Sequence, residues 1–308
     1  MKRIMSCETY KALRLNKVNC AFICNNYMKI INIKTSELVF ISPRIKNIID
    51  VVYISNELLL CVNTTGKSVL LNIVTGEIIK NFNLGPELYN RHFAVFSDSL
   101  WYLNKDWQVY SLDLKTFFRK SLNMEICFGF YDCGKQIYFV FYDKFVRSAV
   151  DSKMRLMRFS KNNNAFDKWV IHLPKGCIDS FTKVDERRAV VVMEHPYMGG
   201  VKNSVYIIDL YSSEMKKIID EKGLDIIMGK VEVCLKMEII FYYADNKMVL
   251  FDIQNSQIIS KFFFNVSIND LKVIFDKRIM LCTNKGVYSF DLNSFVNGVK
   301  SSWKYIEL

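Results

Sequence analysis

Apolar and polar residues alternate over many short runs of this chain, which is the pattern of β-strands with one buried face. Residues 69–79 show the pattern clearly: an apolar run leads to Asn72, a polar turn ends at Gly76, and a second apolar run follows. Thr and Gly in such a turn favour a tight connection between antiparallel strands. The segment therefore predicts a β-hairpin.

The same pattern recurs along the chain. Further copies occupy residues 29–39, 109–117, 205–210, 248–258 and 287–292, with a degenerate copy at 156–159. The polar residues taken as anchors of the copies are Asn32, Asn72, Asp113, Arg158, Asp209, Asp252 and Asp291, spaced by 40, 41, 45, 51, 43 and 39 residues. This period of about 40 to 50 residues is that of a propeller blade.

Two further strand-like runs precede each copy, for example 49–54 and 58–62, so each repeat has four strands. We predict an all-β fold, a seven-bladed β-propeller of four-stranded antiparallel blades that forms a single domain over residues 1–308. The degenerate fourth copy leaves six or eight blades as alternatives. Because a propeller closes by pairing its chain ends, we expect residues 2–5, residues 303–306 or both to complete the last blade.

The motif apolar-x-apolar-Asn/Asp-x-x-Thr-Gly-Glu, seen best at residues 72–77, resembles the repeats of WD-repeat-like and quinoprotein-like propellers. The resemblance extends over nearly the whole chain and implies an architecture rather than a function. The repeats lack the Gly-His and Trp-Asp dipeptides of true WD repeats and the glycine doublets of kelch blades. The four tryptophans do not recur from blade to blade as in quinoprotein dehydrogenases, so we predict no cofactor.

Composition indicates a folded protein with a sizeable core, because 51% of the residues are hydrophobic and 14% are aromatic. The first 15 residues lack the apolar stretch of a secretory signal. Nine scattered cysteines, mostly in apolar runs, are typical of small core residues in a reducing compartment, and we expect a cytoplasmic protein. Cys20 and Cys24 fall on one strand face, but neither a second pair nor a histidine cluster completes a zinc set, so we predict no metal site.

The formal charge of +11 leaves binding to nucleic acid open, although lysine and arginine are spread along the chain without a dense basic tail. A more local feature is the length of two connections between second and third strands, at residues 143–153 and 195–203 of neighbouring units. Insertions in one face of a repeat protein often form its binding surface. The alternative is an insertion that the surface merely tolerates.

Four residues of these two connections are of types that anchor protein interfaces, namely Phe145, Arg147, Tyr197 and Met198. His195 is the fifth candidate binding residue and, beside Glu194, the one plausible acid or base. One histidine next to one carboxylate does not define a reaction, so we predict no catalytic residue. The recurring anchor carboxylates are expected to fix turns by accepting backbone N–H groups.

The leading hypothesis is a non-enzymatic scaffold that presents a loop-rich face to a protein or peptide. The alternative is an enzyme, a hydrolase, lyase or oxidoreductase, with a pocket at the mouth of the central channel, since propellers host such reactions. A propeller that binds nucleic acid is the third possibility.

Overall fold

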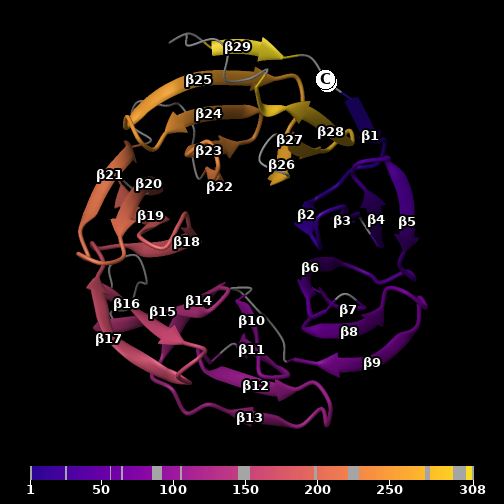
Figure 1. Cartoon of the computed structure of the whole chain (residues 1–308), viewed down its shortest axis with the longest axis horizontal. Coiled ribbons are helices and arrows are strands. Elements are labelled where there is room, and N and C mark those ends of the chain that lie inside the picture. The colour runs from indigo at the N-terminus through magenta and orange to yellow at the C-terminus, as the bar shows by residue number, and fades with distance from the viewer. Residues whose placement is uncertain are drawn as a thin grey trace. The chain divides into compact units, whose positions relative to one another are not determined.

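The computed structural model describes residues 2–24, 26–55, 57–63, 65–84, 92–104, 106–144, 153–197, 200–220, 229–274, 278–293 and 303–306. These residues form seven antiparallel four-stranded blades, and one blade carries an additional strand (Figure 1). The predicted all-β, seven-bladed propeller fold is therefore confirmed. The fourth unit, degenerate in sequence, is a complete blade of strands β14 to β17.

The chain divides into two compact units, Met1–Leu84 with Gly229–Leu308, and Gly85–Met228. The first unit contains blades 1, 2, 6 and 7. Blade 1 is β2 (Lys11–Arg14), β3 (Asn19–Ile23), β4 (Met28–Asn32) and β5 (Glu37–Ile41), and blade 2 is β6 (Ile48–Tyr53), β7 (Leu58–Asn63), β8 (Lys67–Asn72) and β9 (Ile78–Asn83). Blade 6 is β22 (Lys230–Cys234), β23 (Ile239–Ala244), β24 (Lys247–Asp252) and β25 (Gln257–Phe264), and blade 7 is β26 (Ile268–Ile274), β27 (Arg278–Thr283), β28 (Val287–Asp291) and β1 (Lys2–Met5).

The second unit contains blades 3, 4 and 5. Blade 3 is β10 (Phe93–Phe96), β11 (Ser99–Leu103), β12 (Val109–Asp113) and β13 (Arg119–Ser121), and blade 4 is β14 (Cys127–Cys133), β15 (Gln136–Lys144), β16 (Lys153–Ser160) and β17 (Ala165–His172). Blade 5 is β18 (Cys177–Lys183), β19 (Arg188–Tyr197), β20 (Gly200–Asp209) and β21 (Met215–Asp220).

The core lies between neighbouring blades of each unit, so the middle strands are covered on both faces and are apolar without alternation. Ile239, Ile240, Phe241, Tyr242 and Tyr243 of β23 are all buried. The outermost strands are covered on one face only, and most residues of β9 are exposed. This difference explains why the alternating pattern is clear only toward the outer strands.

The anchor residues fix the turns between third and fourth strands, as predicted. The Oδ1 atom of Asn72 accepts the backbone N–H groups of Val74 and Thr75 at 2.8 and 3.0 Å, and Asp209 accepts two N–H groups in the same way. The anchor predicted for blade 4 was wrong. Ser160, paired with Gln136 at the end of β16, occupies that position, and its Oγ accepts the N–H of Asn163 at 3.3 Å. Arg158 instead forms an ion pair with Asp167.

Of the two chain ends, only the first completes the last blade. Strand β1 pairs with β28 and becomes the outermost strand of blade 7. Gly286 (φ +151°) allows this approach, because a Cβ atom there would collide with the carbonyl oxygen of Met5. Strand β29 (Trp303–Ile306) pairs in parallel with β25 on the outer edge of blade 6, outside the blade predicted for it (Figure 1).

The second of the two long connections is mostly strand. Residues 195–197 and 200–203 extend the hairpin of β19 and β20, with His195 paired to Lys202 and Tyr197 to Gly200. The expectation of a loop over these residues was wrong, because the ladder continues as far as the last of these pairs. Residues 145–152 of the first long connection lie outside the described residues. The described part of the chain contains no helix long and apolar enough to cross a membrane.

Candidate functional site

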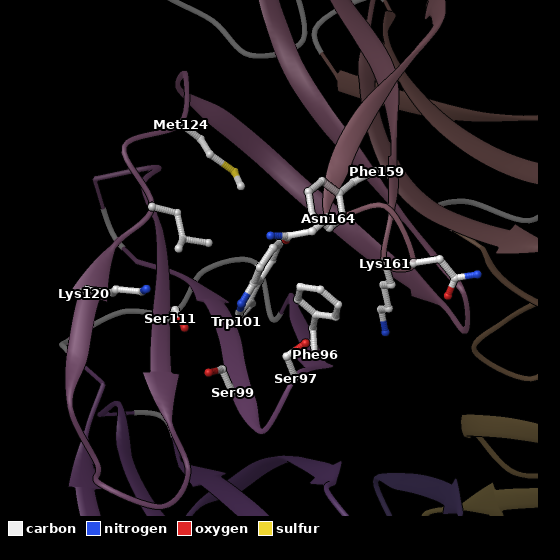
Figure 2. Close-up of a pocket in the computed structure, with 12 residues that line it drawn as sticks. Phe96, Ser97, Ser99, Trp101, Ser111, Lys120, Met124, Phe159, Lys161 and Asn164 are labelled. Carbon is white, nitrogen blue, oxygen red and sulfur yellow. The ribbon is translucent and has the colours of Figure 1, made fainter.

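A cleft of about 620 Å³ lies between blades 3 and 4 of the second unit, and we call it the interblade cleft (Figure 2). Its lining residues are Phe96, Ser97, Ser99, Trp101, Ser111, Lys120, Leu122, Met124, Phe159, Lys161, Asn162 and Asn164. Blade 3 contributes the first eight, and the end of β16 with the turn to β17 contributes the others. The volume is that of a typical ligand site, roughly 300 to 1,000 Å³.

The repeat itself explains why space remains between these two blades. Ser111 lies two residues before the anchor Asp113, opposite Trp101 on β11 and Lys120 on β13. The equivalent positions of four other blades carry Ile30, Leu70, Ile207 and Leu250, whereas blades 4 and 7 have Arg158 and Ser289. A serine where most blades place a branched aliphatic side chain leaves part of the groove unfilled.

Three aromatic rings form the inner wall of the cleft. Trp101 lies 5.2 Å from Phe96 and 5.3 Å from Phe159, measured between ring centroids, and the Phe96 and Phe159 centroids are 5.9 Å apart. The Phe96 ring meets both partners edge to face, a favoured geometry for aromatic pairs. Because Trp101 and Phe159 are also packed in the core between the two blades, the wall is rigid.

Several polar groups surround this aromatic wall, and they do not form hydrogen bonds with one another. Within the described part of the chain, neither the Ser111 hydroxyl nor the Trp101 indole N–H has a hydrogen bond, although these residues are only 3% and 6% exposed. Both residues line the cleft, so a ligand there would supply the missing partners. The exposed side chains of Ser97, Asn162 and Asn164 lie at the rim and add further donors and acceptors.

The two lysines of the cleft differ in their surroundings. Lys161 donates to both oxygens of Asp132 at 2.7 and 2.9 Å and to the Val95 carbonyl at 3.0 Å. Its charge is thereby neutralised, and it ties the end of β16 to β14 and β10. Lys120 is exposed, and among the described residues it has no ion pair. Lys120 is therefore the cation available to a ligand (Figure 2).

Of the predicted binding residues, the structure describes the side chain of His195 alone, and His195 does not line this cleft. Phe145, Arg147 and Met198 lie outside the described residues, as does the side chain of Tyr197. His195 lies on β19, where its Nδ1 is 2.7 Å from the Lys175 carbonyl and its Nε2 is 3.3 Å from the Tyr206 hydroxyl. These contacts connect blade 5 to the segment before it.

The other histidines also make local contacts. His92 Nδ1 lies 2.7 Å from the Phe130 carbonyl, just before β10 begins. His172, 74% exposed, contacts Asp143 at 2.7 Å, and Asp143 also accepts a hydrogen bond from Arg155. Burial opposes ionisation of Asp143, but Arg155 and His172 outweigh it and lower the pKa of that carboxyl.

The innermost strands of the first unit also carry a cluster of polar side chains. Its chemistry bears on the alternative hypothesis that the protein is an enzyme. Asp270 accepts a hydrogen bond from the Tyr243 hydroxyl at 3.0 Å and from the Ala12 N–H at 2.9 Å. Glu232 accepts from Lys272 at 2.8 Å and from the Val273 N–H at 3.1 Å. Every carboxylate oxygen of these two side chains thus has a partner.

These contacts connect neighbouring blades: β22 contacts β26 through Glu232, and β26 contacts β2 through Asp270. Lys11 of β2 then contacts Asp50 of β6 at 2.5 Å. Burial lowers the pKa of Lys272, but the carboxylates of Glu232 and Asp270 outweigh it, so the pKa lies above its ordinary value. Mutually satisfied groups of this kind stabilise a structure rather than act on a substrate. No three His, Cys, Asp or Glu side chains of the described residues form a group that could hold a metal ion.

Comparison with known proteins gives the fold alone. The sequence matches no protein-family model and no curated protein. The solved structure of Kuenenia stuttgartiensis hydrazine synthase is similar with a TM-score of 0.70 at 8% identity, over 97% of this chain and 98% of that chain. The β-propeller domain of Myceliophteria thermophila Swd1 gives 0.71 at 10% identity, over 95% and 99% of the two chains. The N-terminal domain of Nup159 gives 0.57 at 11%, over 92% and 89%.

Proposed function

We propose that this protein is a non-enzymatic propeller that binds a short peptide segment of a partner protein in the interblade cleft. The observation that carries the proposal is the pair of donors at Ser111 and Trp101, which face the cleft beside a preformed aromatic wall and have no hydrogen bond among the described residues. Both donors face the space of the cleft, where water can accept their hydrogen bonds in the free protein. A ligand with carbonyl oxygens at these two points replaces that water and gains orientation from the fixed positions of the donors.

The chemistry of the cleft defines the peptide. The rings of Phe96, Trp101 and Phe159 favour an aromatic or large aliphatic anchor residue. The indole N–H and the serine hydroxyls favour main-chain carbonyl groups of an extended segment. Lys120 favours a carboxylate close to the anchor, and the formal charge of +11 on the whole chain favours the approach of an acidic partner.

Catalysis is not part of the proposal, because the lining of the cleft contains no Asp, Glu, His or Cys. The two lysines of the lining are its remaining candidates for a general acid or base, and Lys161 is already paired with Asp132. A role in protein binding also agrees with one similar solved structure, from S. cerevisiae, in which Dbp5 is bound to Nup159 (TM-score 0.58, 11% identity).

The proposal can be tested by selecting peptides from a random library on the intact protein and measuring their affinity by fluorescence anisotropy. We expect the selected peptides to combine an aromatic or large aliphatic residue with a nearby acidic residue. Ser111→Leu introduces the side chain that Leu70 and Leu250 have at the same position of their blades. It should fill the cleft, weaken binding at least about tenfold, or roughly 1.4 kcal/mol, and leave the fold intact.

A charge reversal with a matched control separates the cleft from general electrostatics. Lys120→Glu should weaken binding of the acidic peptides about tenfold at low salt. Lys80 occupies the equivalent position of blade 2, paired with Leu70, and Lys80→Glu should leave the affinity unchanged. Equal weakening by both variants, or unchanged binding to a folded Ser111→Leu protein, would show that the peptides bind elsewhere.

A further inference from the structure

Two cysteine sulfurs of the first unit are in contact. The Sγ atoms of Cys7 and Cys24 are 3.4 Å apart. Cys7 lies in the connection between β1 and β2, and Cys24 directly follows β3. Cys24 is buried and Cys7 is half-buried. The sequence places these residues 17 positions apart, with no motif that would indicate their contact.

The backbone around Cys7 is fixed by hydrogen bonds, so the contact does not depend on a freely moving chain end. The hydroxyl of the buried Thr9 donates to the Cys7 carbonyl at 3.2 Å. The Thr9 N–H donates to the Thr283 carbonyl at 3.3 Å, and the Asn269 side-chain amide donates to the Thr9 carbonyl at 3.0 Å. Both partners belong to blade 7.

The two thiols differ in the way that a nucleophilic and a resolving cysteine differ. Cys7 is half-buried and so reachable by a small oxidant, and the Lys29 ammonium lies 3.9 Å from its sulfur. Burial raises the pKa of Cys24 to about 12, so Cys24 is a protonated thiol at neutral pH.

We propose that Cys7 and Cys24 form an oxidisable dithiol, a modification site whose oxidant is hydrogen peroxide or an organic hydroperoxide. The Cys7 thiol gives up its proton and its sulfur attacks the peroxide oxygen. The O–O bond breaks, the leaving oxygen takes up that proton and departs as water or an alcohol, and Cys7 becomes a sulfenic acid. The Cys24 sulfur then attacks the Cys7 sulfur. The S–O bond breaks, and the Cys24 proton leaves with the hydroxide as water. Two thiols are oxidised by two electrons, and one peroxide is reduced.

The disulfide has a structural consequence because of where its two cysteines lie. Cys7 follows β1, the strand that completes blade 7 by pairing with β28, and Cys24 belongs to blade 1. A covalent bond between them attaches the closing strand to the next blade. Oxidation is therefore expected to hold β1 in its sheet and to restrict local opening of the chain end.

The test is oxidation of the folded full-length protein with a small excess of hydrogen peroxide, followed by peptide mapping without reductant and by thiol titration. We expect a linked peptide pair containing Cys7 and Cys24 and the loss of two of the nine thiols. The protection of residues 2–5 against hydrogen exchange should rise, with a thermal midpoint higher by a few degrees, and a reductant should reverse both changes.

Three variants are informative. Cys7→Ser and Cys24→Ser should each abolish the linked peptide and the gain in protection. Cys20→Ser, on the strand that precedes Cys24 and fully buried, should retain both effects. The proposal is overturned if the wild-type protein forms only intermolecular disulfides, if Cys7 oxidises to a sulfinic acid without bonding to Cys24, or if the linked peptide forms without a change in the protection of β1.

Discussion

Replacement of Asp270 by alanine should destabilise the protein by removing the acceptor shared by two blades. The side chain is 7% exposed, and its two oxygens accept hydrogen bonds from Tyr243 and Ala12. Alanine leaves two buried donors without partners, at about 1 to 3 kcal/mol each. We therefore expect a loss of about 2 to 6 kcal/mol in the free energy of unfolding. Asparagine should cost about half as much, because an NH2 group replaces one of the two oxygens that accept these hydrogen bonds.

The assay is urea unfolding at neutral pH followed by circular dichroism. The mechanism also predicts coupling: Tyr243→Phe removes the hydroxyl that donates to Asp270 and accepts the Leu271 N–H. The double variant with Asp270→Asn should thus lose less stability than the sum of the two single losses. As control, Asp291→Asn, at an exposed turn, should stay within about 0.5 kcal/mol of wild type. Additive losses, or an Asp270→Ala protein as stable as this control, would refute the reasoning.

Two further predictions concern single turns. Gly286→Ala should destabilise the attachment of β1 by about 1 to 3 kcal/mol, because of the positive φ and the collision with Met5, and hydrogen exchange of residues 2–5 should accelerate. Backbone N–H groups and Arg187 lower the pKa of Asp209 from 3.8 to about 2, so its carboxylate stabilises the fold above about pH 4 and loses this effect as the pH falls toward 2. Asp209→Asn should lower the thermal midpoint at pH 6, and the difference from wild type should vanish near pH 2; a constant difference would contradict this.

The fold could be predicted from the sequence because a propeller repeats one local pattern. Anchor residues such as Asn72 and Asp209 end a third strand and hold its turn, so their spacing reports the blade length. The error at Arg158 arose because a shift of two residues keeps every side chain on the same strand face. Apolar alternation alone could not distinguish Arg158 from Ser160, whose hydroxyl replaces the usual amide or carboxylate.

Contacts between distant parts of the chain could not be predicted in this way. Asp270 and Ala12 are 258 residues apart, and nothing in the local sequence of either indicates their hydrogen bond. The choice between the two chain ends, and with it the place of β29, could not be predicted for a related reason. A short apolar strand can add to any exposed sheet edge, and only its pairing with Lys261–Phe264 shows which edge it takes.

The interblade cleft, in contrast, left a trace in the sequence that a comparison of the repeats can detect. Each position of a blade has six equivalents in the same chain, so a residue that departs from its equivalents marks a place where packing between blades changes. Ser111 departs in this way from Ile30, Leu70 and Leu250, and in the part of the chain that the structure describes neither the Ser111 hydroxyl nor the Trp101 indole N–H beside this space has a hydrogen bond. Insertions are easily recognised in a repeat protein. A small side chain in the groove between two blades, where equivalent positions have a large one, is less conspicuous but changes the chemistry of the surface just as directly.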